Sequence, residues 1–202
     1  MLVVVSAPSG AGKTSLCREI RKVVANLSYS VSHTTRPPRI GEVDGHDFSF
    51  VTEATFRQMV EHGEFAEWAR VHGNLYGTSA RALDESLERG EDILLDIDTQ
   101  GARQLRTRYP QGLYVFVVAP SIKELELRLR ERKSDAPHEI ARRMARAVEE
   151  IAAWREYDYL IVNRHLDEAV RQLACIIEAE RCRTSRLVLG IPDLPGSPEF
   201  HP

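Results

Sequence analysis

A glycine-rich segment near the N-terminus carries the residue types that bind the phosphates of a nucleotide. Residues 6–14 read Ser-Ala-Pro-Ser-Gly-Ala-Gly-Lys-Thr, and they lie between an apolar run at residues 2–6 and a stretch with apolar residues at helical spacing from Lys13 to Ala25. In such a loop, backbone N–H groups and the positive end of the following helix face anionic oxygens, while a lysine reaches the β- and γ-phosphates. The segment therefore predicts a nucleoside triphosphate site, in which Lys13 contacts phosphate and the Thr14 hydroxyl can ligate Mg²⁺.

The loop departs from the strict phosphate-binding pattern at one position, where Ala7 replaces a glycine. A methyl group is tolerable there if the residue has an ordinary φ, since Gly10 and Gly12 still allow close approach of the backbone. The residues predicted to contact the triphosphate are Ala7, Pro8, Ser9, Gly10, Ala11, Gly12, Lys13, Thr14 and Ser15.

Two carboxylates follow a second apolar run, in Ile-Leu-Leu-Asp-Ile-Asp at residues 93–98. Asp96 and Asp98 flank a single isoleucine, and because side chains alternate along a strand we expect both to point to the same side. A buried strand that ends in carboxylates places negative charge where a magnesium nucleotide would bind. We predict that Asp96 ligates Mg²⁺ together with Thr14.

The elements that must position these residues follow an alternating order. Apolar runs at residues 2–6, 93–97, 113–118 and 159–162 are separated by helical patterns, which predicts an α/β fold with a parallel sheet covered on both faces. Helix starts are expected after Thr78 or Ser79, and after Ser121, which forms a capping box with Glu124.

Two segments interrupt this order. Residues 33–79 contain Pro37 and Pro38 and short aromatic stretches, which favour a small β-rich insertion with one helix from Glu53 to His62. Residues 121–156 read as two charged helices on either side of a hinge at residues 133–137. The tail at residues 190–202 is rich in proline and glycine and predicts disorder.

Composition excludes several classes of protein. The 202 residues have 27 Lys and Arg against 30 Asp and Glu, and the net charge of −3 excludes the uniformly basic surface of a general nucleic-acid binder. Three cysteines without a C-x-x-C pair predict neither a disulfide framework nor a zinc site. With no signal peptide and no membrane-length apolar run, we expect a cytoplasmic protein without membrane association. The oligomeric state stays open, a homo-oligomer included.

Five motifs in the same order make the chain, from its first strand to about residue 185, similar to the guanylate kinase family. They are the phosphate loop at 6–14, Thr-Thr-Arg-Pro-Pro-Arg-Ile-Gly-Glu-Val-Asp-Gly at 34–45, Gly-Glu-Phe-Ala-Glu-Trp-Ala at 63–69, Tyr-Gly-Thr-Ser at 76–79 and Leu-Asp-Ile-Asp-Thr-Gln-Gly at 95–101.

The resemblance implies a P-loop NTPase fold, and it implies transfer of the γ-phosphoryl group of ATP to GMP or dGMP with Mg²⁺ as cofactor. It implies a single domain at 1–189, with a core at 1–32, 81–120 and 151–189, a GMP-binding insertion at 33–80 and a lid at 121–150. The acceptor phosphate would be held by Arg36, Arg39 and Tyr76, and guanine would be read by Ser32, Glu67, Thr78 and Asp98. The catalytic cations would be Lys13, Arg36, Arg128, Arg132 and Arg143.

The chemistry of the base agrees with the acidic residues independently. Guanine presents N1–H and N2–H donors, which carboxylates accept, whereas N1 of adenine is an acceptor and would face Glu67 without a proton between them. A site built on such pairs rejects the wrong base by ~10⁴-fold or more. The chain differs from the family at Phe48, in the acceptor-phosphate site, where a tyrosine is typical. This predicts a weaker KM for GMP than in a relative with tyrosine, unless Tyr76, His46 or water supplies the missing hydrogen bond.

The predicted lid is the basic part of the chain. Residues 128–146 contain seven basic and three acidic residues, although a solvated helical hairpin would also explain them. Spacing alone does not choose among Arg142, Arg143 and Arg146. The acceptor is already an ionised phosphate oxygen, so we assign no catalytic histidine and expect catalysis by positioning and charge.

Three other functions fit parts of the pattern. A catalytically weak, protein-binding module of the same family could dispense with Lys13, Thr14 and the lid arginines, all of which are present. A switch GTPase would need an N-K-x-D motif, which is absent. A kinase for another monophosphate would lack the acids at Glu67 and Asp98.

Overall fold

The structure of the protein, a computed structural model, describes residues 1–71, 73–131 and 137–186, without the side chains of 137–139. Arg132, most of the expected hinge at 133–137 and the tail at 190–202 therefore lie outside the described residues. None of the described helices is long and apolar enough to cross a membrane.

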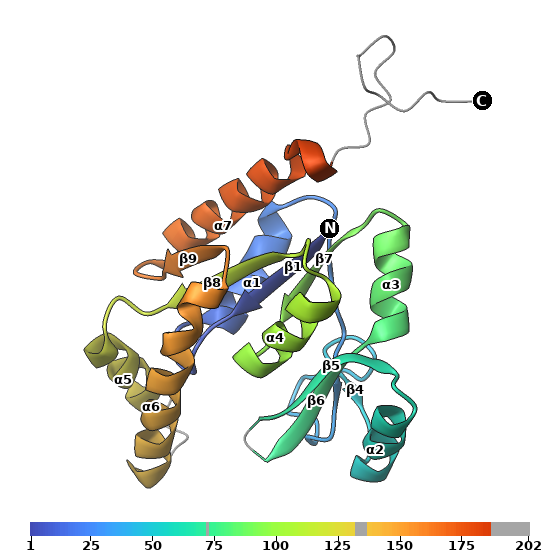
Figure 1. Ribbon diagram of the computed structural model, residues 1–202. Helices are drawn as coiled ribbons and strands as arrows, with labels where there is room; N and C mark the ends of the chain where they lie inside the picture. The colour runs from blue at the N-terminus through green and yellow to red at the C-terminus, as the bar shows by residue number, and fades with distance from the viewer. Residues whose placement is uncertain (72, 132–136, 187–202) are drawn as a thin grey trace, which may run out of the picture.

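The expected parallel sheet is present and has five strands (Figure 1). Its order is β2-β7-β1-β8-β9, with every neighbouring pair parallel. The strands are β1 (Leu2–Ser6), β2 (Leu27–Tyr29), β7 (Asp92–Asp96), β8 (Leu113–Val118) and β9 (Tyr159–Val162). Because the chain leaves β1 toward β2 and later returns to β8, the strand order reverses beside β1. Crevices at such reversals, outside the carboxyl ends of the strands, bind ligands in open α/β sheets.

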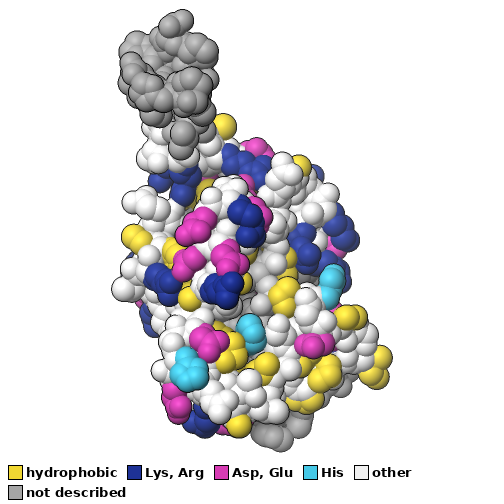
Figure 2. Space-filling model, turned by 90° about the vertical axis from the view of Figure 1, so that its right-hand side faces the viewer, with side chains coloured by type: hydrophobic (Ala, Val, Ile, Leu, Met, Phe, Trp, Pro, Cys, Tyr) yellow, Lys and Arg dark blue, Asp and Glu magenta, His cyan; other side chains and the backbone are white. Residues whose placement is uncertain are grey.

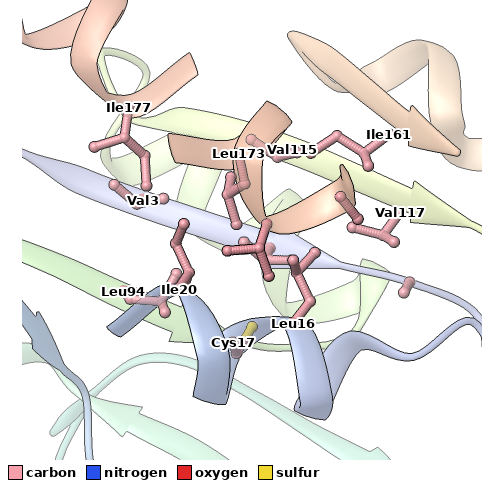
Figure 3. Packing of buried hydrophobic residues seen from close by; sticks show 14 of the residues in the cluster. Val3, Leu16, Cys17, Ile20, Leu94, Val115, Val117, Ile161, Leu173 and Ile177 are labelled. Atoms are coloured by element: carbon pink, nitrogen blue, oxygen red, sulfur yellow. The ribbon is translucent and has the colours of Figure 1, made fainter. Parts of the chain in front are cut away.

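Helices cover both faces of this sheet. The helices α1 (Lys13–Val23) and α7 (Leu166–Arg181) pack on one face, where Leu16, Ile20 and Leu173 meet the sheet residues Val3 and Val115 (Figure 3). The helices α3 (Ala80–Glu88) and α4 (Thr99–Arg108) supply the apolar cluster on the other face. The β1 strand is buried from end to end, as the continuous apolar run predicts for a strand covered on both sides.

Residues 33–79, which interrupt the alternation of strands and helices, form a second, four-stranded sheet in the order β4-β3-β6-β5. Its strands are β3 (His33–Thr34), β4 (Ser49–Phe50), β5 (Phe65–Val71) and β6 (Asn74–Ser79), and α2 (Glu53–Glu61) matches the expected helix. Gln104 fastens this sheet to α4: its amide donates to Trp68 O at 2.8 Å and accepts from Trp68 N at 3.2 Å. The β-rich insertion is thus attached to the core through α4.

The charged hairpin contains α5 (Ile122–Glu131) and α6 (Pro137–Ile151), and two short 3₁₀ helices lie at Ala152–Glu156 and Thr184–Arg186. Leu125 and Leu129 of α5 are buried. A Cβ atom placed on Gly10 would lie 3.0 Å from Leu129 Cγ. The hairpin therefore packs directly against the glycine-rich loop and is not only a solvated surface element.

Helix starts follow the expected caps in part. Ser79 caps α3 by accepting from Ala82 N, and Ser121 Oγ accepts from Glu124 N at 3.1 Å. The expected return bond of the Glu124 carboxylate is replaced by a bond from Arg128 Nε at 2.9 Å. On the face that carries α3, basic and acidic side chains are interspersed (Figure 2), and Arg81 pairs there with Glu85.

Candidate active site

The glycine-rich loop joins the carboxyl end of β1 to the first turn of α1. Gly10 and Gly12 have φ values of 91° and 92°, a backbone conformation that favours glycine. Among the described residues other than glycine, only Asn26 has a positive φ, so Ala7 has the ordinary backbone that its methyl group requires. Because α1 begins at Lys13, the N–H groups of Lys13, Thr14 and Ser15 have no intrahelical acceptor and lie at the positive end of the helix.

Asn163, directly after β9, fixes the loop from the neighbouring side. Its side chain is buried, and Nδ2 donates to Ala11 O at 2.8 Å. A Cβ atom on Gly12 would lie 2.5 Å from the same nitrogen, so glycine is needed for this contact. Sequence reasoning missed Asn163; the available signal was an amide immediately after a buried strand, at the edge where the loop lies.

Lys13 is bound to the end of β7. Its Nζ lies 2.5 Å from Asp96 Oδ1 and donates to Ile97 O at 2.8 Å. Burial lowers the pKa of Lys13, but the charge and hydrogen bond of Asp96 outweigh burial and leave that pKa above its ordinary value. The ammonium group is therefore charged at neutral pH, next to the loop.

Asp98 does not belong to the strand that ends at Asp96. It is the N-cap of α4, where Oδ1 accepts from Gly101 N at 2.9 Å. Alternation along a strand therefore does not apply to this pair, and the two carboxylates have different partners: Asp96 faces Lys13, whereas Asp98 faces the first turn of α4 and Arg146. An acidic N-cap is stabilised by the positive end of the helix it begins.

Glu67 is the buried acid of the second sheet. A register shift between Phe65 and Glu67 lets β5 pair Glu67 directly with Thr78 of β6, and Thr78 Oγ1 donates to Glu67 Oε1 at 2.6 Å. Only 4% of Glu67 is exposed. Burial and the nearby charge of Asp98 raise the pKa of Glu67 to about 7, although the bond from Thr78 opposes this.

Gly101 brings the two acids together. A Cβ atom at this position would collide with Glu67 Oε2 and lie 3.5 Å from Asp98 Oδ1. The first turn of α4 can approach the carboxylate only because residue 101 has no side chain. Ser32 lies one residue before His33, which pairs with Gly77, and this antiparallel register puts Ser32 level with Thr78. The four residues predicted to read a base thus lie around one corner between the two sheets.

Arg36 lies in a separate cluster on the insertion. Its guanidinium binds both oxygens of Glu42, each at 2.9 Å, and it lies 5.2 Å from the centre of the Phe48 ring. The Phe48 ring in turn meets Tyr76 edge-on at 6.1 Å. Arg39 is exposed, and its backbone N–H donates to Glu42 Oε2 at 2.7 Å. Sequence reasoning quoted Glu42 within a motif but gave it no role.

The lid arginines have different partners. Arg128 binds Glu124 and also reaches Arg164 O at 3.5 Å, beside Asn163. Arg143 lies on α6, one turn before Arg146. Arg146 bonds Glu150 at 3.0 Å and lies 3.7 Å from Asp98 Oδ2. The structure therefore brings to the acids an arginine that spacing had left undecided and that the resemblance did not nominate.

Known proteins resemble this chain in sequence over most of its length. The guanylate kinase family model matches residues 1–180. The chain is 53% identical to a guanylate kinase of Geobacter metallireducens over 188 residues, which cover 93% of each chain. It is 50% identical to the guanylate kinase of Geobacter sulfurreducens over 194 residues, 96% of each chain.

A solved structure is similar over nearly the same span. The crystal structure of guanylate kinase from Anaplasma phagocytophilum matches with a TM-score of 0.78 and 32% identity, and the match covers 92% of this chain and 88% of that one. Residues 1–180, which the family model matches, include the loop at Lys13, the second sheet and the α5–α6 hairpin. This chain belongs to the guanylate kinase family.

Proposed function

We propose that the protein is an ATP:GMP phosphotransferase, which reversibly transfers the γ-phosphoryl group of ATP to GMP or dGMP and gives ADP and GDP. The observation that carries this proposal is the pair of acids formed by buried Glu67 and partly buried Asp98, which meet at Gly101 and lie within electrostatic range of Lys13. A phosphate loop alone accommodates any nucleoside triphosphate, whereas two carboxylates at its side select a base that donates hydrogen bonds.

Guanine fits this corner because it offers N1–H and N2–H together. Glu67 and Asp98 would accept these donors, and hydroxyl groups of Ser32 and Thr78 complete the polar lining. Adenine would bring a lone pair toward Glu67 and leave a buried acceptor unpaired, which costs about 1–3 kcal/mol or more for a charged group. The acids therefore explain a preference for GMP over AMP.

The acceptor phosphate would bind at Arg36, Arg39 and Tyr76. Glu42 supports this assignment, because its carboxylate already receives two parallel N–H bonds from Arg36. A phosphate monoester presents the same paired acceptor oxygens to a guanidinium. Arg36 thus already binds one anion in this bidentate way, and the acceptor phosphate would take the place of Glu42 at the same N–H groups.

ATP would bind its phosphates along residues 7–15. The donors there are the loop N–H groups and Lys13, and the charge of Lys13 is maintained by Asp96. Thr14 and Asp96 offer the hydroxyl and carboxylate oxygens that Mg²⁺ prefers, so these two residues fit a magnesium ion bound together with the nucleotide. When bound, the ion supplies positive charge to the phosphate oxygens.

The transfer step needs no general base in this arrangement. The attacking atom is an ionised oxygen of GMP, so these residues act by aligning the two phosphate groups and neutralising the charge that spreads over the transferring group. Lys13 would do this from the loop and Arg36 from the insertion, with Arg128 and Arg143 acting from the hairpin. Arg132 is assigned with them from the family pattern.

The three parts of the chain would then have separate tasks. The core at 1–32, 81–120 and 151–189 holds ATP, the insertion at 33–80 holds GMP, and the hairpin at 121–150 closes over the phosphates and excludes water. The direct packing of Leu129 on the glycine-rich loop supports a lid that responds to what the loop binds. The cytoplasmic location expected from the sequence stays a prediction.

A coupled assay of ADP release with GMP, AMP, CMP and UMP tests the proposed function. We expect turnover with GMP that exceeds turnover with AMP by ~10⁴-fold. Turnover with none of the four monophosphates would instead favour the protein-binding module, and equal turnover with AMP and GMP would remove the role of the acids.

Replacing Phe48 by tyrosine should strengthen GMP binding. The ring lies between Arg36 and Tyr76, so a new hydroxyl would join the residues assigned to the acceptor phosphate. A hydrogen bond to a charged group contributes about 1.5–3 kcal/mol, and we expect the KM for GMP to fall about tenfold. Guanosine, which has no phosphate, serves as control: its inhibition constant should not change. An unchanged KM for GMP would show that Phe48 lies away from the phosphate.

A further inference from the structure

Arg146 connects the lid helix α6 to the acid that caps α4. Its guanidinium nitrogen lies 3.7 Å from Asp98 Oδ2, and its Nε donates to Glu150 Oε1 at 3.0 Å. The side chain is 31% exposed and that of Asp98 is 14% exposed, so this contact is only partly open to water. In Figure 1 the N-terminal end of α4 lies between α6 and the β5–β6 pair.

Several carboxylates lie near Asp98, and a cation at this place balances their negative charge. Three carboxylates, those of Glu67, Asp98 and Glu150, interact electrostatically in this region, and the charge of Asp98 raises the pKa of both of the others, in each case after the larger effect of burial. Two other cations act on Asp98 from further away, but Lys13 is bound to Asp96 and Arg103 to Glu156. Among the ion pairs of the described residues, the partner of Asp98 is Arg146.

Both oxygens of Asp98 accept hydrogen bonds from α4, and one of them also faces α6. Oδ1 accepts from Gly101 N at 2.9 Å and caps α4, whereas Oδ2 accepts from Gln100 Nε2 at 3.1 Å and faces Arg146. The plane of the carboxylate is therefore fixed from α4 on one side and attracted toward α6 on the other. A shift of α6 would change the electrostatic environment of Oδ2 and leave the hydrogen bond from Gly101 N to Oδ1 unchanged.

We propose that Arg146 is a positioning residue for guanine recognition, which acts through Asp98 and makes GMP affinity depend on the position of α6. This inference rests on the proposed function, because it takes Asp98 as one of the guanine-reading acids. It differs from the assignment of Arg128 and Arg143, which act on phosphate. Arg146 acts at the base, on the same helix as Arg143, so guanine binding and lid placement are coupled through one ion pair.

Replacing Arg146 by glutamine is expected to raise the KM and the calorimetric Kd for GMP about tenfold, within the usual range of coupling between sites, while kcat and the KM for ATP change less than threefold. Arg146→Lys keeps the charge and should restore the Kd to within about threefold of the wild type. Arg130→Gln is the matched control, since Arg130 is an exposed arginine of the same hairpin bonded to Glu126, and it should leave every constant unchanged. A fall in kcat with unchanged Kd for GMP would overturn the proposal, because Arg146 would then act on the phosphates.

A double-mutant cycle with Asp98→Asn separates positioning from a general effect on the fold. Asparagine can still cap α4 but has no charge for Arg146 to hold. We expect Arg146→Gln to weaken GMP binding in the wild-type background and to have no further effect in the Asp98→Asn background. Additive effects would overturn the proposal. Failure of the proposed function is distinguishable, since the wild-type protein would then show no GMP-dependent ADP release at all.

Discussion

Replacing Lys13 by methionine is expected to lower kcat for phosphoryl transfer from ATP to GMP by about 10²- to 10³-fold, the effect of removing one group that stabilises transition-state charge. Methionine has similar length and fills the same space without charge. The ammonium group lies at the start of α1, 2.5 Å from Asp96 Oδ1, and it is the cation that the loop itself contributes. The measurement is steady-state ADP release at saturating ATP and GMP, with circular dichroism to confirm folding.

The change at Lys13 also has a stability effect that must be separated from catalysis. Asp96 would lose its partner, and leaving a largely buried charged group unpaired costs about 1–3 kcal/mol or more. Adding Asp96→Asn to the Lys13→Met variant should recover the melting temperature but not kcat. Lys22→Met is the control within the same helix, since Lys22 is exposed and paired with Glu19, and kcat should stay within twofold. A Lys13→Met enzyme within tenfold of the wild-type kcat would contradict the assignment of the loop.

Replacing Glu67 by glutamine should stabilise the protein and impair recognition of GMP. The folded-state pKa of Glu67 is raised to about 7, first by burial and then by Asp98. The unfolded chain releases this proton near its ordinary pKa, so the free energy of unfolding falls as pH rises from about 4.5 to about 7. Because one pKa unit corresponds to about 1.4 kcal/mol, the ionised carboxylate costs on the order of 3 kcal/mol above pH 7. The glutamine variant should gain that amount at pH 8 and show no gain at pH 4.

The same substitution should raise the KM for GMP by at least about 100-fold, because an amide offers one acceptor and turns its N–H₂ group toward guanine donors. In the wild-type enzyme, kcat/KM for GMP should fall as pH drops below about 7, since protonated Glu67 accepts less well, and the glutamine variant should lack this dependence. Glu64→Gln changes an exposed acid three residues earlier and should leave the stability curve and the KM unchanged. A glutamine variant that keeps the wild-type KM would show that guanine binds elsewhere.

The gain in stability and the loss of GMP recognition expected for Glu67→Gln have the same cause. Glu67 is buried at a cost in stability, and at the proposed site that cost would be offset by the hydrogen bonds that guanine donates to its carboxylate. Natural proteins commonly retain such destabilising residues where function needs them. The stability gained by Glu67→Gln and the recognition it loses are therefore two measurements of the same buried charge.

Local sequence patterns were sufficient to predict those structural elements that depend only on residues close together in the chain. The continuous apolar runs predicted the parallel strands, and the glycines before Lys13 predicted a strand, loop and helix, because burial and backbone conformation are properties of short segments. Glu67 was nominated by the family resemblance and by the chemistry of guanine, and the structure adds that it is buried.

Contacts between distant segments were decided by the tertiary structure. Asn163 reaches Ala11 across 152 positions of the chain, Glu67 meets Thr78 through a shifted strand register, and Arg146 reaches Asp98 from a different helix. Hydrophobic periodicity says which face of an element is buried but not which element lies against it. Sequence patterns therefore predicted the glycine-rich loop and its parallel sheet and nominated the residues proposed to bind guanine, whereas sheet register and helix packing brought together the carboxylates, the amide and the arginine around them.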